Sequence, residues 1–238
     1  MASYLTIVQA RMGSTRLPGK VMLELCTKPV IWHVVERLKL SKKGGKVVVA
    51  TSQSRSDDSL CDYLKEADIE YFRGSEHDVL DRFYRASGQY PSELIVRATA
   101  DNPLVDPIIM DETIAFFERE KVRYAKTKGF PPGIGIEVFD TDLLEEAYRN
   151  AHSDYEREHV TPYMFTAQPS HSEYMSVLQY DGPRLTMDTR EDYELIRDIY
   201  EHLNHGSHDF FMADILAYMK TRKCHEYKYS KKEAIEKE

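Results

Sequence analysis

The residues best suited to chemistry lie in the loop that follows the first apolar run of the chain. This stretch, residues 7–20, reads I-V-Q-A-R-M-G-S-T-R-L-P-G-K and places Arg11, Arg16 and Lys20 among two glycines and a proline. The apolar run predicts a buried strand, which the glycines and the proline end. Small residues let the backbone approach an anion closely, and three cations converge there, so we predict an anion-binding loop. The alternative is an ordinary surface loop with solvated charges.

Two aspartates follow the predicted ends of later strands. Asp101 comes after L-I-V-R-A-T-A (94–100), and Asp188 comes after R-L-T-M, which we interpret as another strand end. Because ligands of open α/β sheets bind at the carboxyl ends of the strands, we expect both carboxylates beside the basic loop. Such oxygen ligands suit Mg²⁺ that shares its coordination with substrate phosphates. The alternatives are a turn residue at Asp101 and a helix N-cap at Asp188.

A basic loop combined with an acidic pair favours nucleotidyl transfer. The cations and the metal would neutralise a triphosphate, orient it in line and stabilise charge as pyrophosphate leaves. A GT-A glycosyltransferase that uses a sugar nucleotide is one alternative, but such enzymes usually carry D-x-D where this chain has A-D-N-P. A non-catalytic nucleotide-binding partner in polysaccharide assembly is another. That protein would be expected to have lost Lys20 or an acidic ligand, and this chain has lost neither.

Alternating predicted strands and helices must position these residues. The apolar runs at 46–52 and 94–100 are typical of strands buried on both faces of a parallel sheet. Shorter strands are predicted at 69–72, 122–125, 134–139 and 174–180. Helices are predicted to begin at Pro29, at a cap formed by Ser56 or Asp57, at Asp78, at Pro107 (through about 120) and at Asp140 or Thr141. Another begins near Asp154 and is broken at Pro162. The last two follow M-D-T-R-E-D-Y, ending near His205, and cover 211–221. The alternation predicts an α/β fold, a three-layer structure with a mostly parallel sheet.

Composition limits the class of protein. The chain has 238 residues, 42% hydrophobic and 30% charged, which is typical of a soluble globular protein. The net charge of −8 argues against a nucleic-acid binder, and no apolar run is long enough to span a membrane. Three scattered cysteines and the lack of a signal peptide favour the cytoplasm. A single domain is predicted over 1–228, followed by a polar tail at 229–238.

Six stretches carry a family resemblance and are spread in order from residue 7 to about 197. They are the basic loop, K-P-V-I-W-H-V-V-E-R-L, R-A-T-A-D-N-P-L-V-D-P, G-I-E-V-F, E-R-E-H-V-T-P-Y and M-D-T-R-E-D-Y. The chain resembles the cytidylyltransferase family that includes CMP-KDO and CMP-acylneuraminate synthetases, and most closely its branch of spore coat polysaccharide biosynthesis proteins. It departs from the synthetases at S-E-H-D-V-L-D-R-F (75–83) and over 127–140.

The resemblance implies a fold, an activity and partners. The fold would be the nucleotide-diphospho-sugar transferase fold of nucleotidyltransferases, related to GT-A enzymes. The activity would be Mg²⁺-dependent transfer of CMP from CTP to a sugar acid or sugar-like acceptor, with release of pyrophosphate, for surface polysaccharide or glycan synthesis. A homodimer is expected from the family and from the apolar helix at 211–221.

The resemblance also implies roles for particular residues. Arg11 and Lys20 would hold the triphosphate, and Asp101 and Asp188 would bind the metal. These four are the predicted catalytic residues. The predicted nucleotide-binding set consists of Ala10, Arg11, Met12, Gly13, Ser14, Arg16, Lys20, Arg73 and Asp101, with Arg73 near the cytosine and the backbone of Ala10, Met12 and Gly13 near the base and phosphates.

Four further residues are predicted to bind the acceptor. Glu137 lies in a strand pattern on the side opposite Ile136 and Val138, where it is either an exposed acid or a hydroxyl-binding group. The other three are Arg157 and His159 in E-R-E-H and Arg190 in M-D-T-R-E-D-Y. For the E-R-E-H residues, the alternative is a solvated helix face with ion pairs four residues apart.

Overall fold

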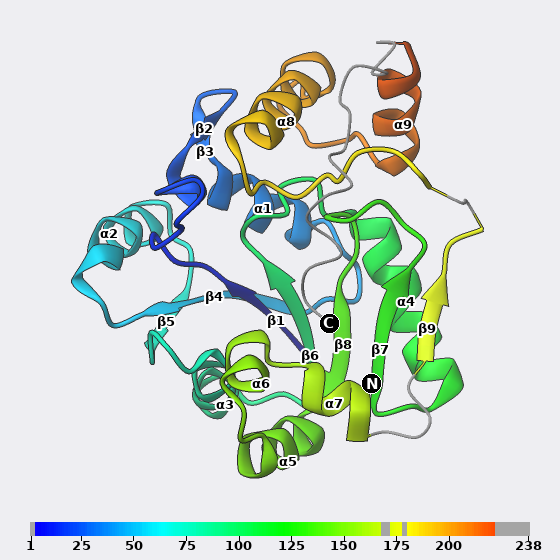
Figure 1. The fold of residues 1–238 in the computed structure, drawn as a ribbon. Coiled ribbons are helices and arrows are strands. Elements are labelled where there is room, and N and C mark those ends of the chain that lie inside the picture. The colour runs from blue at the N-terminus through cyan, green and yellow to red at the C-terminus, as the bar shows by residue number, and fades with distance from the viewer. Residues whose placement is uncertain (1–2, 168–171, 178–179, 222–238) are drawn as a thin grey trace.

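The framework of the molecule is one seven-stranded sheet with the strand order β5-β4-β1-β6-β8-β7-β9 (Figure 1). The computed structural model describes residues 3–167, 172–177 and 180–221. The strands of this sheet are β1 (Tyr4–Gln9), β4 (Lys46–Ser52), β5 (Tyr71–Gly74), β6 (Leu94–Thr99), β7 (Tyr124–Lys128), β8 (Glu137–Asp140) and β9 (Ser172–Met175). A two-stranded hairpin, β2 (Glu24–Leu25) with β3 (Lys28–Pro29), stands apart and was not predicted.

The sheet is mixed but mostly parallel. Strand β1 pairs in parallel with β4 and β6, β4 pairs in parallel with β5, and β7 pairs in parallel with β9. Only β8 runs against its neighbours β6 and β7 among the described strands of this sheet. The carboxyl ends of β1, β4 and β6 therefore meet at one edge, which confirms the predicted α/β class and places the basic loop and Asp101 together.

Helices cover both faces of the sheet and complete three layers (Figure 1). Successive residues of a central strand point to opposite faces, so Val8 packs in one core and Ile7 in the other. The Val8 face is covered by α1 (Val30–Lys39), α2 (Asp58–Glu66), α4 (Pro107–Glu120), α8 (Arg190–Leu203) and α9 (Met212–Thr221). The Ile7 face is covered by α3 (Val79–Gln89), α5 (Thr141–Asn150) and α7 (Pro162–Ala167).

Local signals place several helix ends correctly. Asp106 caps α4 by accepting hydrogen bonds from the amides of Ile108 and Ile109, and Pro107 occupies the first helical position. Asp140 caps α5, as predicted. The predicted break near Pro162 is confirmed, because α6 (Asp154–His159) ends before it and α7 begins at Pro162.

Several strand predictions are wrong in their bounds. The strands predicted at 69–72 and 122–125 begin two residues later, at Tyr71 and Tyr124. The strand predicted at 134–139 begins only at Glu137, because the carbonyl of Ile134 accepts the amide of Asp106 at 2.9 Å instead of joining a ladder. The strand predicted at 174–180 corresponds to β9, which ends at Met175. Residues 178–179 and the predicted tail at 229–238 lie outside the described residues.

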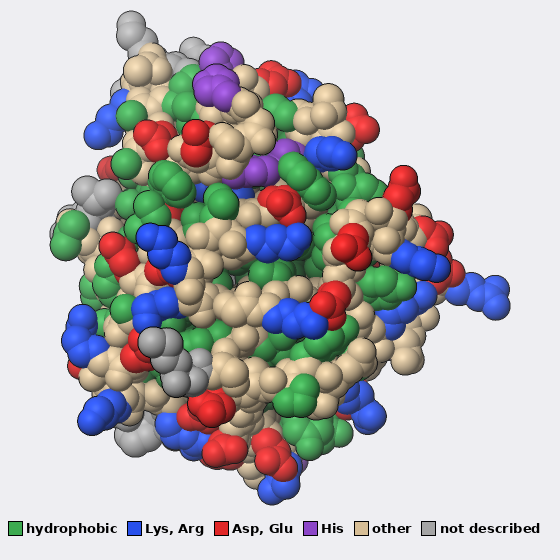
Figure 2. Space-filling view, turned by 180° about the vertical axis from the view of Figure 1, so that it is seen from behind, with side chains coloured by type: hydrophobic (Ala, Val, Ile, Leu, Met, Phe, Trp, Pro, Cys, Tyr) green, Lys and Arg blue, Asp and Glu red, His purple; other side chains and the backbone are tan. Residues whose placement is uncertain are grey.

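The visible surface carries charges of both signs (Figure 2). On the face shown in Figure 2, acidic and basic side chains are interspersed and do not gather into a basic patch. None of the helices in the described ranges is long and apolar enough to cross a membrane.

A buried histidine pair lies between α1 and the segment after α8. His33 Nε2 is 2.6 Å from the carbonyl of Leu25, and His33 Nδ1 is 2.7 Å from His208 Nε2. A carbonyl can only accept, so neutral His33 carries its proton on Nε2 and accepts at Nδ1 from His208. Burial lowers the pKa of both imidazoles to about 4 because it disfavours the charged form.

This pair predicts acid-sensitive stability. Between pH 6.5 and about 4, the unfolded histidines bind protons that the folded ones exclude, so the free energy of unfolding falls as pH falls through this window. The slope is at most about 1.4 kcal/mol per pH unit for each excluded proton. Urea unfolding at several pH values is expected to show a shallower slope for His208→Gln than for wild type. His205→Gln, in an exposed position, should keep the wild-type slope, and equal slopes in all three proteins would contradict the prediction.

Candidate active site

The basic loop leaves β1 at Gln9 and folds back on itself around one residue. The carbonyl of Met12 accepts hydrogen bonds from the amides of Ser14 at 2.9 Å and Gly19 at 3.1 Å. In this fully described segment, the backbone amides of Arg11, Gly13, Thr15 and Arg16 donate to no protein atom. A curled loop with free N–H groups is a suitable place for phosphate oxygens. It borders an open pocket of about 320 Å³.

Lys20 brings the two predicted carboxylates together. Its Nζ lies 2.9 Å from Asp101 Oδ2 and 2.9 Å from Asp188 Oδ1, although these residues are 81 and 168 positions away in the chain. The lysine side chain is only 13% exposed. Arg16 adds a second cation 3.3 Å from Asp188. Basic loop and acidic pair therefore meet at one point, as the sequence predicts.

Asp188 is ionised in this environment. Burial alone would raise its pKa, but the hydrogen bond and charge of Lys20, with help from Arg16 and Arg184, outweigh burial and hold the pKa below its ordinary value. Asp101 is oriented by Thr99, whose hydroxyl donates to Asp101 Oδ1 at 2.5 Å. Both carboxylates are thus fixed as acceptors that face the loop.

The prediction that Asp188 ends a strand is wrong. Residues 185–188 form an irregular segment that crosses the sheet edge, which we call the strap. The amide of Leu185 donates to the carbonyl of Pro132 at 2.7 Å, and the amide of Met187 donates to the carbonyl of Asp101 at 2.8 Å. The alternating apolar pattern is real, because Leu185 and Met187 are fully buried, but it anchors the strap in the core under α8 and makes no strand ladder.

The remaining predicted site residues are distributed unevenly. Ala10, Arg11, Gly13, Ser14 and His159 line the pocket beside the cluster, together with Glu158 of α6, which lies 3.6 Å from Arg11. Met12 contributes the backbone carbonyl that accepts the amides of Ser14 and Gly19. Three predicted cations do not line this pocket or the second pocket described below. They pair with nearby carboxylates instead: Arg73 with Asp58, Arg157 with Asp78 and Arg190 with Glu194.

Several residues at the pocket or next to it were not among the predicted site residues, and four of them carry polar contacts described here. Thr99 and Glu158 line it, as does Arg82, whose buried guanidinium donates to the carbonyls of Ser75 and Glu76. Arg184 lies 3.6 Å from Asp188 and 2.6 Å from Asp192. Two of them had a signal in the sequence, since Thr99 lies two residues before Asp101 and Glu158 stands between Arg157 and His159 in E-R-E-H.

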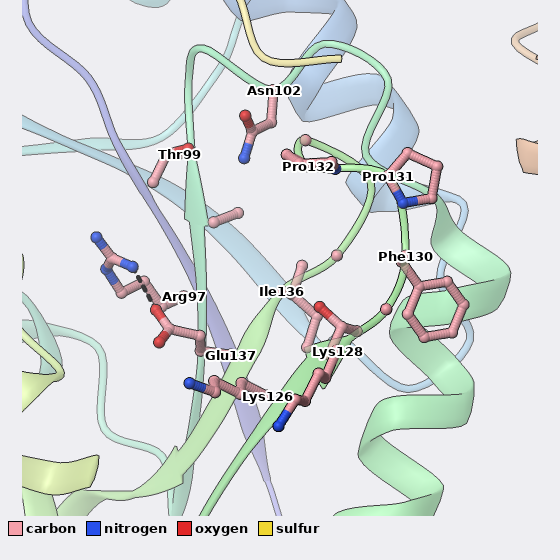
Figure 3. Close-up of a pocket in the computed structure, with 15 residues that line it drawn as sticks. Arg97, Thr99, Asn102, Lys126, Lys128, Phe130, Pro131, Pro132, Ile136 and Glu137 are labelled. Atoms are coloured by element: carbon pink, nitrogen blue, oxygen red, sulfur yellow. Dashed lines mark hydrogen bonds and ion pairs between the residues drawn. The ribbon is translucent and has the colours of Figure 1, made fainter. Parts of the chain in front are cut away.

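A second pocket, of about 430 Å³, adjoins the first and shares Thr99 with it (Figure 3). Figure 3 shows Arg97 of β6 paired with Glu137 of β8, with Lys126 and Lys128 of β7 at the same end of the pocket. Glu137 faces away from buried Ile136 and Val138, as the alternation predicts, and also accepts hydrogen bonds from Tyr124 and Thr161. Burial would raise the pKa of Glu137, but Arg97 and these hydroxyls lower it.

The architecture defines the fold of the protein. It is the nucleotide-diphospho-sugar transferase fold of nucleotidyltransferases, as two solved structures show. A CMP-2-keto-3-deoxy-manno-octonic acid synthetase in complex with CTP matches 84% of this chain and 99% of its own, with a TM-score of 0.68 and 17% identity. Rv0371c of Mycobacterium tuberculosis in complex with manganese matches 82% and 98%, with a TM-score of 0.59 and 13% identity.

The chain belongs to the cytidylyltransferase family, whose family model matches residues 5–229. The spore coat polysaccharide biosynthesis protein SpsF of Bacillus subtilis is 37% identical over 214 residues, which cover 84% of this chain and 88% of SpsF. A cytidylyltransferase from Leptospira borgpetersenii shares 33% identity with a TM-score of 0.86 over 92% of this chain and 95% of its own. The resemblance read from the motifs is confirmed.

Proposed function

We propose that this protein transfers CMP from CTP to a sugar acid or sugar-like acceptor and releases pyrophosphate, in surface polysaccharide or glycan synthesis. The observation that carries the proposal is the convergence of Lys20, Asp101 and Asp188 beside a loop with free amides. Family membership and the CTP complex of the synthetase with this fold support the choice of nucleotide.

The two carboxylates fit a divalent cation. Both already contact one ammonium nitrogen at 2.9 Å, so their oxygens converge on a single cation position. The described residues contain no group of three or more histidine, cysteine or acidic side chains suited to a metal. Phosphate and water oxygens would therefore complete the coordination of Mg²⁺, which prefers such mixed ligand sets. When bound, the metal would neutralise phosphate charge and orient the triphosphate.

The residues of this chain would act by positioning and electrostatics. An acceptor oxygen attacks the α-phosphorus of CTP, a new P–O bond forms, and the bond to the bridging oxygen breaks as pyrophosphate leaves with the electron pair. The free amides of Arg11 and Gly13 would hold phosphate oxygens. Lys20, Arg11 and Arg16 would offset the negative charge that develops on the leaving group.

We assign the acceptor to the second pocket. It adjoins the carboxylate cluster through Thr99, so an acceptor there would lie beside the α-phosphate of a nucleotide in the first pocket. Its lining offers three cations, Arg97, Lys126 and Lys128, against one carboxylate, Glu137. That charge balance favours an acceptor with both hydroxyls and a negative group.

The proposal is tested by following pyrophosphate release. The protein is incubated with Mg²⁺, each of CTP, GTP, UTP and ATP, and a panel of sugar acids, sugar phosphates and phosphonates. CTP with one of the acidic acceptors is expected to give release that Asp101→Ala abolishes. Absence of pyrophosphate release from every pair of nucleotide and acceptor, in wild type and variant alike, would contradict the proposed transfer activity.

Lys20→Ala is expected to weaken CTP binding by about tenfold or more, because it removes a charged donor from the phosphate site. The free energy of unfolding should change by only about 1 kcal/mol, since both carboxylates that it leaves are partly solvated. Calorimetry gives the affinity and urea unfolding gives the stability. Lys39→Ala, which removes an exposed lysine of α1, is the control. A large loss of stability with unchanged CTP affinity would show that Lys20 is structural.

A further inference from the structure

Asp57 is a buried carboxylate that does not do what its position predicts. It stands at the N-cap of α2, but its side chain makes no capping bond, and Ser56 donates to Ser54 instead. The predicted position of the cap is confirmed, since Asp57 is the N-cap residue of α2, but the hydrogen bond expected of a capping side chain is absent. The Asp57 residue is 1% exposed, so its carboxylate has been withdrawn from solvent for other partners.

Those partners are the basic loop and the end of β4. Asp57 Oδ1 accepts the backbone amide of Met12 at 2.8 Å. Asp57 Oδ2 accepts from the Ser52 hydroxyl at 2.5 Å, the Thr51 hydroxyl at 2.9 Å and the Ser52 amide at 3.0 Å. Four donors satisfy a buried ionised carboxylate well, and they hold its pKa below the ordinary value although burial alone would raise it. The carboxylate thus bridges the loop to the strand beside β1.

Met12 is the residue through which the loop can be held. Its carbonyl gathers the amides of Ser14 and Gly19, so both arms of the loop depend on its position. Among the backbone amides of residues 11–20, all within the described part, only that of Met12 donates to a residue elsewhere in the chain. The hydrogen bond to Asp57 is therefore the backbone anchor of the loop.

We propose that Asp57 is a positioning residue for the nucleotide: its carboxylate fixes Met12 so that the free loop amides and Lys20 face the triphosphate. The inference rests on the proposed function of the loop. Asp57 lines neither pocket and touches no substrate position, so it acts through Met12. A preorganised loop binds phosphate without paying for its own ordering, and loss of the anchor should appear first in nucleotide affinity.

The test compares Asp57→Ala and Asp57→Asn with wild type. Alanine removes all four acceptor contacts, whereas the asparagine oxygen can still accept from Met12. We expect the Kd for CTP with Mg²⁺ to rise about tenfold or more in the alanine variant and less in the asparagine variant. KM for CTP should rise more than kcat falls, and KM for the acceptor should stay unchanged. Amide exchange at Met12 should be faster in the alanine variant.

A matched control separates loop positioning from general stability. Asp111 holds the 41–43 turn in the same way, by accepting from the Ser41 hydroxyl at 2.5 Å and from the amides of Lys42 and Lys43 at 3.0 Å. Asp111→Ala should lower the unfolding midpoint and leave the Kd for CTP unchanged. If Asp57→Ala is too unstable to assay, Asp57→Asn carries the test.

The outcomes distinguish the two proposals. Wild-type affinity for CTP in both Asp57 variants, or equal loss in the Asp57 and Asp111 alanine variants, would overturn the role of Asp57 while the proposed function stands. A wild-type protein that binds no CTP would overturn the proposed function, and the role of Asp57 with it.

Discussion

Replacement of Asp188 by alanine is expected to lower kcat for pyrophosphate release by about a hundredfold or more while the protein stays folded. In the proposed site this carboxylate would be one of the two oxygen ligands of the cation, and it contacts Lys20 and Arg16. Loss of one electrostatic contact to the reacting phosphates costs about 3 kcal/mol of barrier, which corresponds to this factor. The change should appear at saturating CTP and acceptor.

Stability should change little in Asp188→Ala because Lys20 and Arg184 keep other partners and Arg16 is exposed to solvent. Lys20 still contacts Asp101, and Arg184 still contacts Asp192 at 2.6 Å. Thermal unfolding and circular dichroism check that the fold is intact. Asp188→Asn, which keeps the shape and removes the charge, should lose nearly as much activity. Activity within about twofold of wild type in the asparagine variant would contradict a role for the charge.

Gly133→Ala is expected to destabilise the protein on the order of 3 kcal/mol and to lower activity at the same time. Gly133 has φ of +102°, and an added Cβ would lie 2.4 Å from the carbonyl oxygen of Leu185 and 2.8 Å from the amide nitrogen of Thr186. The side chain would push the strap away from the sheet edge. Because the strap carries Asp188, its displacement should raise the Mg²⁺ concentration needed for half-maximal activity and lower kcat.

Gly206→Ala is the control for backbone strain. Gly206 has nearly the same φ, +105°, but a Cβ there would meet no atom within 4 Å. Its cost should therefore be that of the unfavourable backbone conformation alone, about 1 kcal/mol, with unchanged activity. Urea unfolding measures both variants. Equal destabilisation by the two substitutions would show that contact between Gly133 and the strap is unimportant.

Much of the framework was predictable because it depends on local patterns. The apolar runs that became β1, β4 and β6 place apolar residues on both faces of the sheet, such as Ile7 and Val8 of β1, which suits central strands covered by helices on both sides. The breaks after them, at Ala10 and Asp101, follow from glycine and proline. Since parallel strands bring their carboxyl ends to one edge, the meeting of the basic loop with Asp101 follows from sequence and topology rules alone.

The other half of the cluster was predicted for a wrong reason. Asp188 does lie beside Lys20, but the alternating apolar residues before it serve as buried anchors of the strap. An apolar residue at every second position indicates only that these side chains lie on the same side of an extended backbone. Whether the backbone then pairs with a strand or with loop carbonyls depends on which segments lie next to it. For the strap, these are Pro132 and Asp101, far away in the sequence.

The sequence by itself determined the α/β framework, the basic character of the loop and the family, because these depend on local composition and the order of motifs. Only the tertiary structure decided how the polar side chains are used. Asp57, an expected helix cap, anchors the basic loop, and Arg73 pairs with Asp58 outside the pocket. A polar side chain bonds to whichever donor or acceptor folding brings within about 3 Å, and such distances between distant segments are set by the packing of the whole chain.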